Sequence, residues 1–213
     1  MKRRFSIVFI LVAALLVAVL IACGNNGGKD TEEYLNILQS GTYTLSGDGT
    51  YDGNYYMTLS YVDGENYNIR YRNPNDLYFR FLYNNGTLYK VIENLKLYGA
   101  APADAIPHSL VSNIMDYDFS SAKYSKSDST TLYGEKYKYD TYTLNKKNGE
   151  KATLNIYIEP ENGLLYAIAL SSDIDIIINI NFLTPGLPED GYVEIPEDFE
   201  EMDYWQLDYY PQI

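Results

Sequence analysis

The sequence contains one Cys, one His and one Trp, and its 16 Lys and Arg residues are outnumbered by 29 Asp and Glu residues. A single Cys forms no internal disulfide, and one Cys with one His supplies too few ligands for a zinc site, which takes three or four. The acidic excess disfavours binding to nucleic acid through bulk charge. We therefore expect no metal, no cofactor and no nucleic-acid partner.

Catalytic motifs are also missing: the chain has no G-x-S-x-G, H-E-x-x-H, G-x-G-x-x-G or P-loop pattern. The lone His108 suits a capping or surface position better than the role of a general base. Residues 48–54 place acids in a turn without the spacing of an EF-hand, so an Asx-type turn is favoured over a calcium site. Acidic pairs could serve glycoside hydrolysis, but they are expected by chance in so acidic a chain. Such pairs are Asp116/Asp118, Asp173/Asp175 and Glu197/Asp198. The sequence therefore predicts a protein that is not an enzyme.

The N-terminus has the layout of an export signal. Lys2-Arg3-Arg4 precedes a run of 18 residues, Phe5 to Ala22, in which only Ser6 is polar. The run ends in Leu20-Ile21-Ala22-Cys23-Gly24, which resembles the bacterial lipobox. This resemblance implies that Cys23 carries a diacylglycerol and becomes the mature N-terminus, so that two acyl chains anchor the protein. An uncleaved transmembrane anchor is the alternative, because about 17–25 apolar residues can span a bilayer. Both place the rest of the chain on the extracytoplasmic face of the cell membrane.

The chain divides into three parts on these signals. Residues 1–22 are the predicted lipoprotein signal peptide, and residues 23–30, polar and rich in Gly, are a flexible tether. Residues 31–213 are predicted to form a single β-rich domain, since domains typically have about 100–200 residues. A two-lobed solute receptor is disfavoured, because two α/β lobes need a longer chain.

A short helix opens the predicted domain. Asp30 or Thr31 is a plausible N-cap, Tyr34, Leu35 and Leu38 recur at helical spacing, and the helix is expected to end near Gly41. After it the hydrophobic period changes to two, and turn sequences recur: Asp63-Gly64, Asn84-Asn85-Gly86, Asn148-Gly149 and Asn162-Gly163. These patterns predict about nine strands in two sets, arranged as an antiparallel meander.

The segment between the two sets has a different pattern. Residues 99–118 suit one or two short helices, which need the apolar face of the sheet to be stable. Their alanines are compatible with ordinary close packing, which we favour, or with a cavity. Residues 120–129 are rich in Ser and Lys and predict a solvated loop.

The order of helix, strands, helical insertion and further strands, closed by Ile195-Pro196-Glu197-Asp198-Phe199, resembles the LolA/LolB-like superfamily of bacterial lipoprotein carriers. Local similarities are residues 42–47 and 134–137, and the resemblance covers most of residues 30–200. It implies an α+β fold: a strongly curved antiparallel sheet shaped as an incomplete barrel, with short helices over its concave face and an apolar ligand between. A chain fixed at Cys23 cannot shuttle, which favours a stationary holder of a lipid or lipidated peptide.

Apolar side chains of the concave face and of the insertion are the candidate ligand-binding residues. They are Tyr55, Met57, Leu59, Phe79, Phe81, Ile106, Leu110 and Ile114.

The 24 Tyr residues are the strongest anomaly of the composition. Alternation places Tyr55, Tyr61, Tyr67 and Tyr71 on the inner face. It places Tyr56, Tyr78, Tyr89 and Tyr157 on the outer face. Tyrosine on the outer face either replaces charged residues on an exported β-surface or forms a recognition face for an envelope protein or polysaccharide. For the aromatic C-terminal tail, residues 204–211, packing against the sheet edge is favoured.

Overall fold

The computed structural model describes residues 30–50, 54–62, 66–72, 78–102, 114–132, 134–172, 175–187 and 193–209. The predicted signal peptide and tether, except Asp30, lie outside these residues, as do Cys23 and His108. Within the described part of the chain, no helix combines the length and the hydropathy that crossing a bilayer requires.

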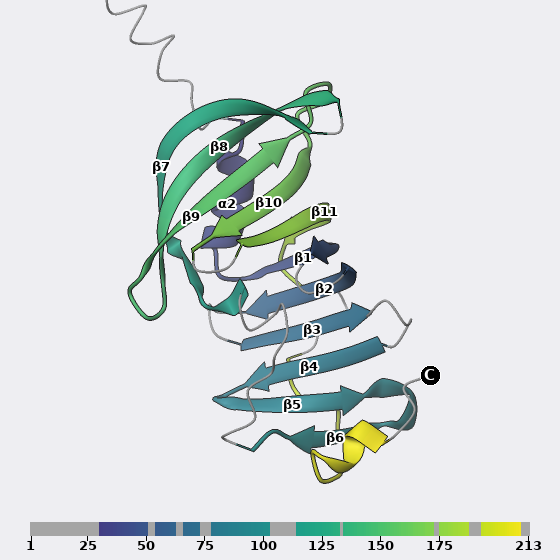
Figure 1. Ribbon diagram of the computed structural model, residues 1–213. Helices are drawn as coiled ribbons and strands as arrows, with labels where there is room; N and C mark the ends of the chain where they lie inside the picture. The colour runs from purple at the N-terminus through teal and green to yellow at the C-terminus, as the bar shows by residue number, and fades with distance from the viewer. Residues whose placement is uncertain are drawn as a thin grey trace, which may run out of the picture.

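The described elements are one α-helix, twelve strands and two 3₁₀ helices (Figure 1). The first run comprises α2 (Glu32–Gln39), β1 (Tyr43–Thr50), β2 (Asn54–Val62), β3 (Asn66–Arg72), β4 (Tyr78–Asn84), β5 (Thr87–Ile92), η1 (Glu93–Leu95) and β6 (Leu97–Ala100). The second run comprises β7 (Tyr117–Leu132), β8 (Glu135–Lys146), β9 (Lys151–Ile158), β10 (Leu165–Ser171), β11 (Asp175–Pro185), β12 (Glu200–Glu201) and η2 (Gln206–Tyr209).

All twelve strands belong to one open sheet, in the order β12-β6-β5-β4-β3-β2-β1-β11-β10-β9-β8-β7. Strands β1–β6 form one antiparallel meander and β7–β11 form another, and the pairing of β1 with β11 joins them. The prediction of a single meander is therefore wrong, because the first strand lies in the middle of the sheet. The predicted fold class is confirmed: a curved, mostly antiparallel sheet that does not close into a barrel, with a short helix against it.

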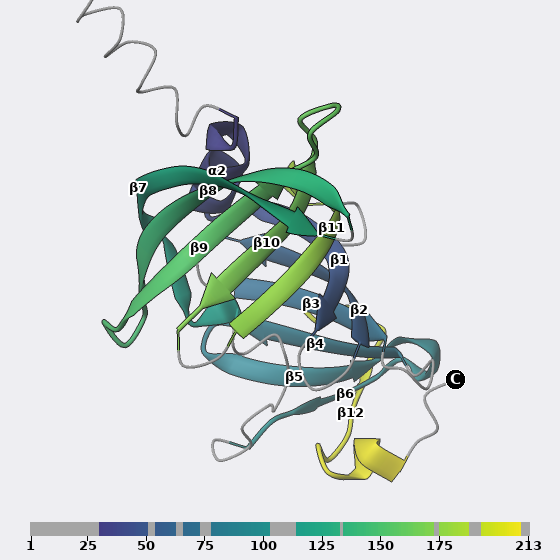
Figure 2. The same ribbon diagram turned by 45° about the horizontal axis from the view of Figure 1, so that its top comes forward.

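The sheet bends so that its two halves face each other around a shared core (Figure 2). We call β7–β11 with α2 the helical half, and β2–β6 with β12 and η2 the C-terminal half. The inner face of the sheet is the one that carries Ile69, Phe81 and Ile156. All three are buried in one hydrophobic cluster, which we call the main cluster. The opposite side is the outer face.

Helix α2 lies inside the bend of the helical half, behind β8–β10 in Figure 1. Its boundaries agree with the prediction, since it begins after Thr31 and ends at Gln39. Leu35 and Leu38, three residues apart, are buried in the same cluster as the inner-face side chains of β9 and β11. An eight-residue helix is too short to be stable alone, so this burial stabilises it.

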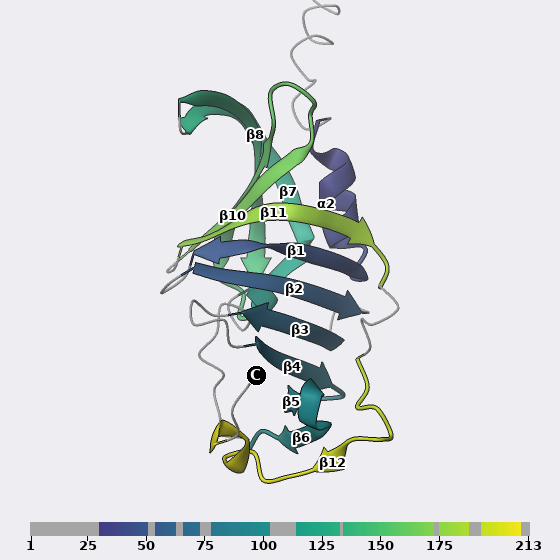
Figure 3. The ribbon, with the colours of Figure 1, turned by 90° about the vertical axis from the view of Figure 1, so that its right-hand side faces the viewer.

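The last part of the chain closes the other end of the sheet. Residues 193–199 run along the outer side of the C-terminal half, and the chain then passes under β6 to the inner side, where η2 lies (Figure 3). On the way β12 pairs with β6 in parallel. Gly99 allows the close approach, because a Cβ there would lie 2.7 Å from the Met202 carbonyl oxygen and 2.9 Å from Leu207 Cδ1.

Two predictions for the middle of the chain need correction. Residues 120–129, expected to be a loop, belong to the 16-residue strand β7. Half of its residues, including the run 123–128, are exposed, and the strand forms the edge of the sheet beyond β8. Ser and Lys suit such an edge, because polar side chains prevent pairing with another chain. The region 99–118, expected to be helical, needs correction only at its two ends, which belong to β6 and β7. Residues 114–115 are helical, and residues 103–113 lie outside the described part.

Candidate functional site

The structure distributes the eight candidate ligand-binding residues over two strands and the connection between β6 and β7. Ile106 and Leu110 lie outside the described residues, and the side chains of Tyr55, Met57, Leu59 and Phe79 are likewise not described. Phe81 and Ile114 are described. They are 8% and 2% exposed and belong to the same buried cluster.

Strand register brings the candidate positions of β2 and β4 to one patch of the sheet. Position 57 pairs with Tyr71, which pairs with position 79. One step along, position 59 pairs with Ile69, which pairs with Phe81. The candidates of β2 and β4 are thus separated by β3 alone, and Ile69, 0% exposed, occupies the centre of this patch.

Aromatic rings and one cation border this patch. Tyr67 and Tyr83, opposite each other on β3 and β4, stack with ring centroids 5.3 Å apart and an interplanar angle of 9°. Tyr67 is buried in the main cluster, which confirms its predicted inner position. Lys90 lies opposite Phe81 on β5 and is 5% exposed, so a buried lysine adjoins this patch.

The end of the connection between β6 and β7 reaches the same cluster. Ile114 and Met115, which lead into β7, belong to it together with Phe81 and Ile69. The segment just before them carries Ile106 and Leu110. The structure therefore brings the end of this connection, residues 114–115, into the same cluster as the inner face of β3 and β4.

A buried polar cluster fixes the start of the domain to the helical half. The Thr31 hydroxyl donates to Asp140 Oδ2 at 2.6 Å and shares a second hydrogen bond of 2.6 Å with the Tyr142 hydroxyl. Ser127 Oγ donates to the other carboxylate oxygen of Asp140. Burial raises the pKa of Tyr142, and the nearby Asp140 carboxylate adds to this shift. Thr31 was predicted as an N-cap, but its side chain makes no cap hydrogen bond, because it bonds across to β8 instead.

Four tyrosines gather on the outer face of the helical half. The rings of Tyr139 and Tyr157 are 4.9 Å apart, and those of Tyr137 and Tyr166 are 4.3 Å apart. Burial raises the pKa of Tyr137 to about 12 and also raises that of Tyr157. Alternation along β9 places Tyr157 on the other face of the sheet from the buried Ile156, which agrees with its predicted outer position. The clustering itself was missed, since Tyr166 sits at an irregularity between β9 and β10 that breaks the alternation.

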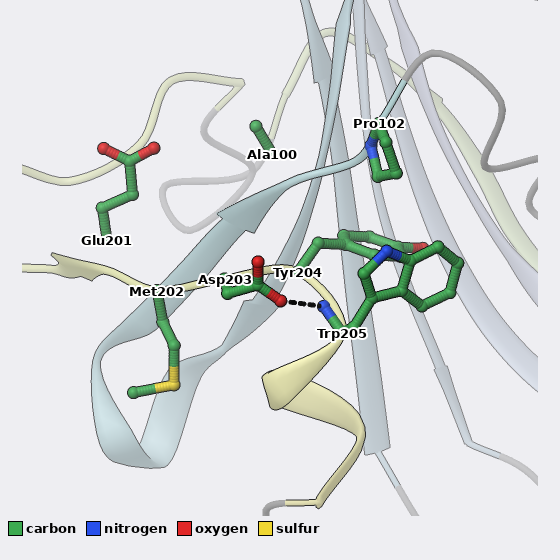
Figure 4. Close-up of a pocket in the computed structure, with 7 residues that line it drawn as sticks. All are labelled: Ala100, Pro102, Glu201, Met202, Asp203, Tyr204 and Trp205. Atoms are coloured by element: carbon green, nitrogen blue, oxygen red, sulfur yellow. Dashed lines mark hydrogen bonds between the residues drawn. The ribbon is translucent and has the colours of Figure 1, made fainter.

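A pocket of about 480 Å³ lies between β6 and the C-terminal segment (Figure 4). We call it the C-terminal pocket, and its lining residues are Ala100, Pro102, Glu201, Met202, Asp203, Tyr204 and Trp205. The expected packing of the tail holds for Leu207, which is 0% exposed, but not for Trp205, which is 54% exposed. In the sequence, the single Trp of the chain among several Asp and Glu residues is a signal of this pocket. The residues of the opposite wall, Ala100 and Pro102, lie about 100 residues earlier.

Residues able to hold a metal do not gather in the described part of the chain. No group of three or more His, Cys, Asp or Glu side chains lies close enough there to ligate an ion.

No family model matches the sequence, and the comparison with curated proteins found no match. Among solved structures, the chain has a likeness to the crystal structure of MucB, with a TM-score of 0.35 and 9% identity over 80% of this chain. The chain spans 64% of that protein's length. A second likeness is to a domain from Vibrio parahaemolyticus described as a putative outer membrane lipoprotein-sorting protein. Its TM-score is 0.28 and its identity 10%, over 73% of this chain and 94% of that one.

Proposed function

We propose that this protein is a lipid-anchored, extracytoplasmic and non-catalytic binding protein that holds a hydrophobic ligand, a lipid or a lipidated peptide. The ligand lies between the inner face of β2–β4 and the connection from β6 to β7. The observation that carries the proposal is the shared cluster of Phe81 and Ile114, which come from these two walls. Binding sites for hydrophobic ligands are lined mainly by apolar and aromatic side chains of this kind.

The proposed anchor limits where this protein works. Residues 24–30 would connect the lipidated Cys23 to Thr31, and seven extended residues span at most about 25 Å. Because Thr31 is tied to Asp140 on β8, the helical half would face the membrane. A ligand that leaves or enters the bilayer would therefore meet the protein within a short distance.

Photo-crosslinking in cells tests the ligand. A benzophenone amino acid replaces Phe81 in the full chain, and the matched control replaces Ile177, which is 46% exposed on β11. After irradiation, mass spectrometry of the purified protein should find a lipid or lipidated peptide attached at position 81, several-fold more than at position 177. Equal adducts at both positions would indicate contact with the bilayer alone. Absence of an adduct at position 81 would refute ligand binding.

A separate experiment tests the anchor. Cells grown with an alkyne-tagged fatty acid should label the full chain, and Cys23→Ala should abolish the label. Labelling that survives in the Cys23→Ala variant would contradict lipidation at this residue. The result is independent of the crosslinking experiment. The proposal of lipidation at Cys23 and the proposal of ligand binding can therefore be refuted separately.

The second candidate function is an interaction module that binds an envelope protein or polysaccharide through its outer tyrosines. The pairs Tyr139/Tyr157 and Tyr137/Tyr166 favour it, since they place two ring contacts on the outer face of the helical half. Tyr139→Ser with Tyr157→Ser should remove a partner recovered by crosslinking in intact cells. The control, Tyr89→Ser on the C-terminal half, should retain the partner. Unchanged recovery of the partner in the double variant would exclude the outer face of the helical half as its binding site.

A further inference from the structure

The C-terminal pocket combines two aromatic rings with two carboxylates. Figure 4 shows Tyr204 and Trp205 on one side of the pocket, the Glu201 carboxylate on the other and Asp203 between them. The two rings meet edge to face, with centroids 5.1 Å apart and an interplanar angle of 87°. The indole of Trp205 is 54% exposed, so much of its surface is open to a ligand.

Backbone contacts hold the pocket walls in place. The Met202 N–H donates to the Tyr98 carbonyl at 2.8 Å, next to the pairing of β12 with β6. Asp203 Oδ1 accepts a hydrogen bond of 3.0 Å from the backbone N–H of Trp205. This bond fixes the carboxylate beside the rings. Leu207, 0% exposed, packs over Gly99 and anchors the segment on the other side. The pocket is therefore built by the fold, with the aromatic rings and the carboxylates in defined positions.

The charge of this region has one sign. Residues 193–209 contain seven Asp and Glu residues and no Lys or Arg. Lys96 lies near, but it pairs with Asp198 at 2.6 Å. Within the described residues, Glu201 and Asp203 have no cation as a partner. An incoming positive charge thus meets carboxylates that are not neutralised by this part of the protein.

We propose that the C-terminal pocket binds an organic cation, a primary ammonium or guanidinium group on an apolar stem. The ammonium group pairs with Asp203 and Glu201, and the face of Trp205 attracts it through the ring quadrupole. The stem packs against Pro102, Ala100 and Met202. A free polyamine and a lysine side chain of a peptide both carry this chemistry, and the site is separate from the inner face proposed to hold a hydrophobic ligand.

The test uses the intrinsic fluorescence of the protein, because Trp205 is its single Trp. The purified full chain in a neutral detergent is titrated with cadaverine, with a lysine-rich peptide and with pentanediol, which matches cadaverine in length without its charge. Cadaverine or the peptide should change the Trp205 emission in a saturable way, and pentanediol should not. Saturation by cadaverine assigns the site to free amines, and saturation by the peptide alone assigns it to a protein ligand.

Two double variants with equal charge change decide whether the pocket is responsible. Glu201→Gln with Asp203→Asn should weaken binding about tenfold or more, while the amide oxygen introduced at position 203 still accepts the Trp205 N–H. Glu33→Gln with Glu161→Gln, both exposed in the helical half, should leave binding unchanged. The proposal is overturned if both double variants lose affinity equally, if neither does, or if pentanediol binds as well as cadaverine.

Discussion

The helical half packs around α2 from the start of the domain, whereas the C-terminal half ends against the last residues of the chain. In the helical half, Leu35 and Leu38 join the main cluster, and the Thr31–Asp140–Tyr142 hydrogen bonds fix the helix to β8. In the C-terminal half, Leu207 packs over Gly99 at the edge, outside that cluster. The comparison indicates that the helical half supplies most of the main cluster, while the edge of the C-terminal half, where Leu207 packs outside it, forms a pocket.

The largest expected effect is the loss of core packing in the helical half. Leu38→Ala should lower the free energy of unfolding by about 2–5 kcal/mol, because it leaves a cavity beside the inner face of the sheet. Chemical denaturation of the full chain, followed by circular dichroism, measures it. The matched variant Leu207→Ala should change the Trp205 emission while the main unfolding transition moves less. Equal shifts of that transition would contradict the comparison.

The seam between the two meanders is the next place to test. At Gly47 a Cβ would meet the Asn179 carbonyl oxygen and lie 2.8 Å from Ile178 Cγ2, where the β1–β11 pairing has its irregularity. Gly47→Ala should therefore destabilise the protein by about 1–3 kcal/mol, the usual cost of overpacking. Gly99→Ala, the matched change at the sheet edge, should displace the C-terminal segment and alter the Trp205 emission. If Gly47→Ala unfolds at the same denaturant concentration as the wild type, the close packing of β1 against β11 at this seam is contradicted.

A smaller effect is expected from the polar cluster at the start of α2. Asp140→Asn replaces a carboxylate that accepts from both Thr31 and Ser127, and it should cost about 1 kcal/mol. Faster hydrogen exchange of the α2 amides would accompany this loss. The control Asp128→Asn, at an exposed ion pair with Lys126, should leave the exchange of α2 unchanged. Unaltered exchange in Asp140→Asn would show that apolar packing alone holds the helix.

The sequence predicted the strands that have a local signal. Alternating apolar residues and Asn-Gly turns identified β4, β5 and β8–β10, because these strands are half-buried and joined by tight turns. It missed β7, whose residues 123–128 are exposed on both faces, and the short strands β6 and β12, which have four and two residues. The pairing of β1 with β11 was also missed, since it joins segments more than 120 residues apart and leaves no local pattern.

The candidate site shows the same division. Alternation placed Phe81 on the inner face, and apolar spacing placed Ile114 in the segment that meets it, so both were found from local patterns. The C-terminal pocket was not found, because Ala100 and Pro102 meet residues 201–205 only through tertiary packing. The ring contact of Tyr137 with Tyr166 was missed because it joins β8 and β10 across β9, at the irregularity of the β9–β10 pairing.

The smallest expected effect is a change of stability at high pH. It comes from the ionisation of Tyr137 on the outer face of the helical half. The pKa of Tyr137 is raised to about 12 by burial, against an ordinary value of 10.0. Between these pH values the unfolded chain releases a proton that the folded protein retains, so this contribution to stability is complete below pH 10 and is lost as the pH rises toward 12. Tyr137→Phe removes the ionisable group, and its free energy of unfolding should therefore fall less steeply over this range than that of the wild type. Alkaline denaturation curves of the two proteins measure the difference, and parallel curves would mean that Tyr137 ionises in the folded protein as readily as in the unfolded chain.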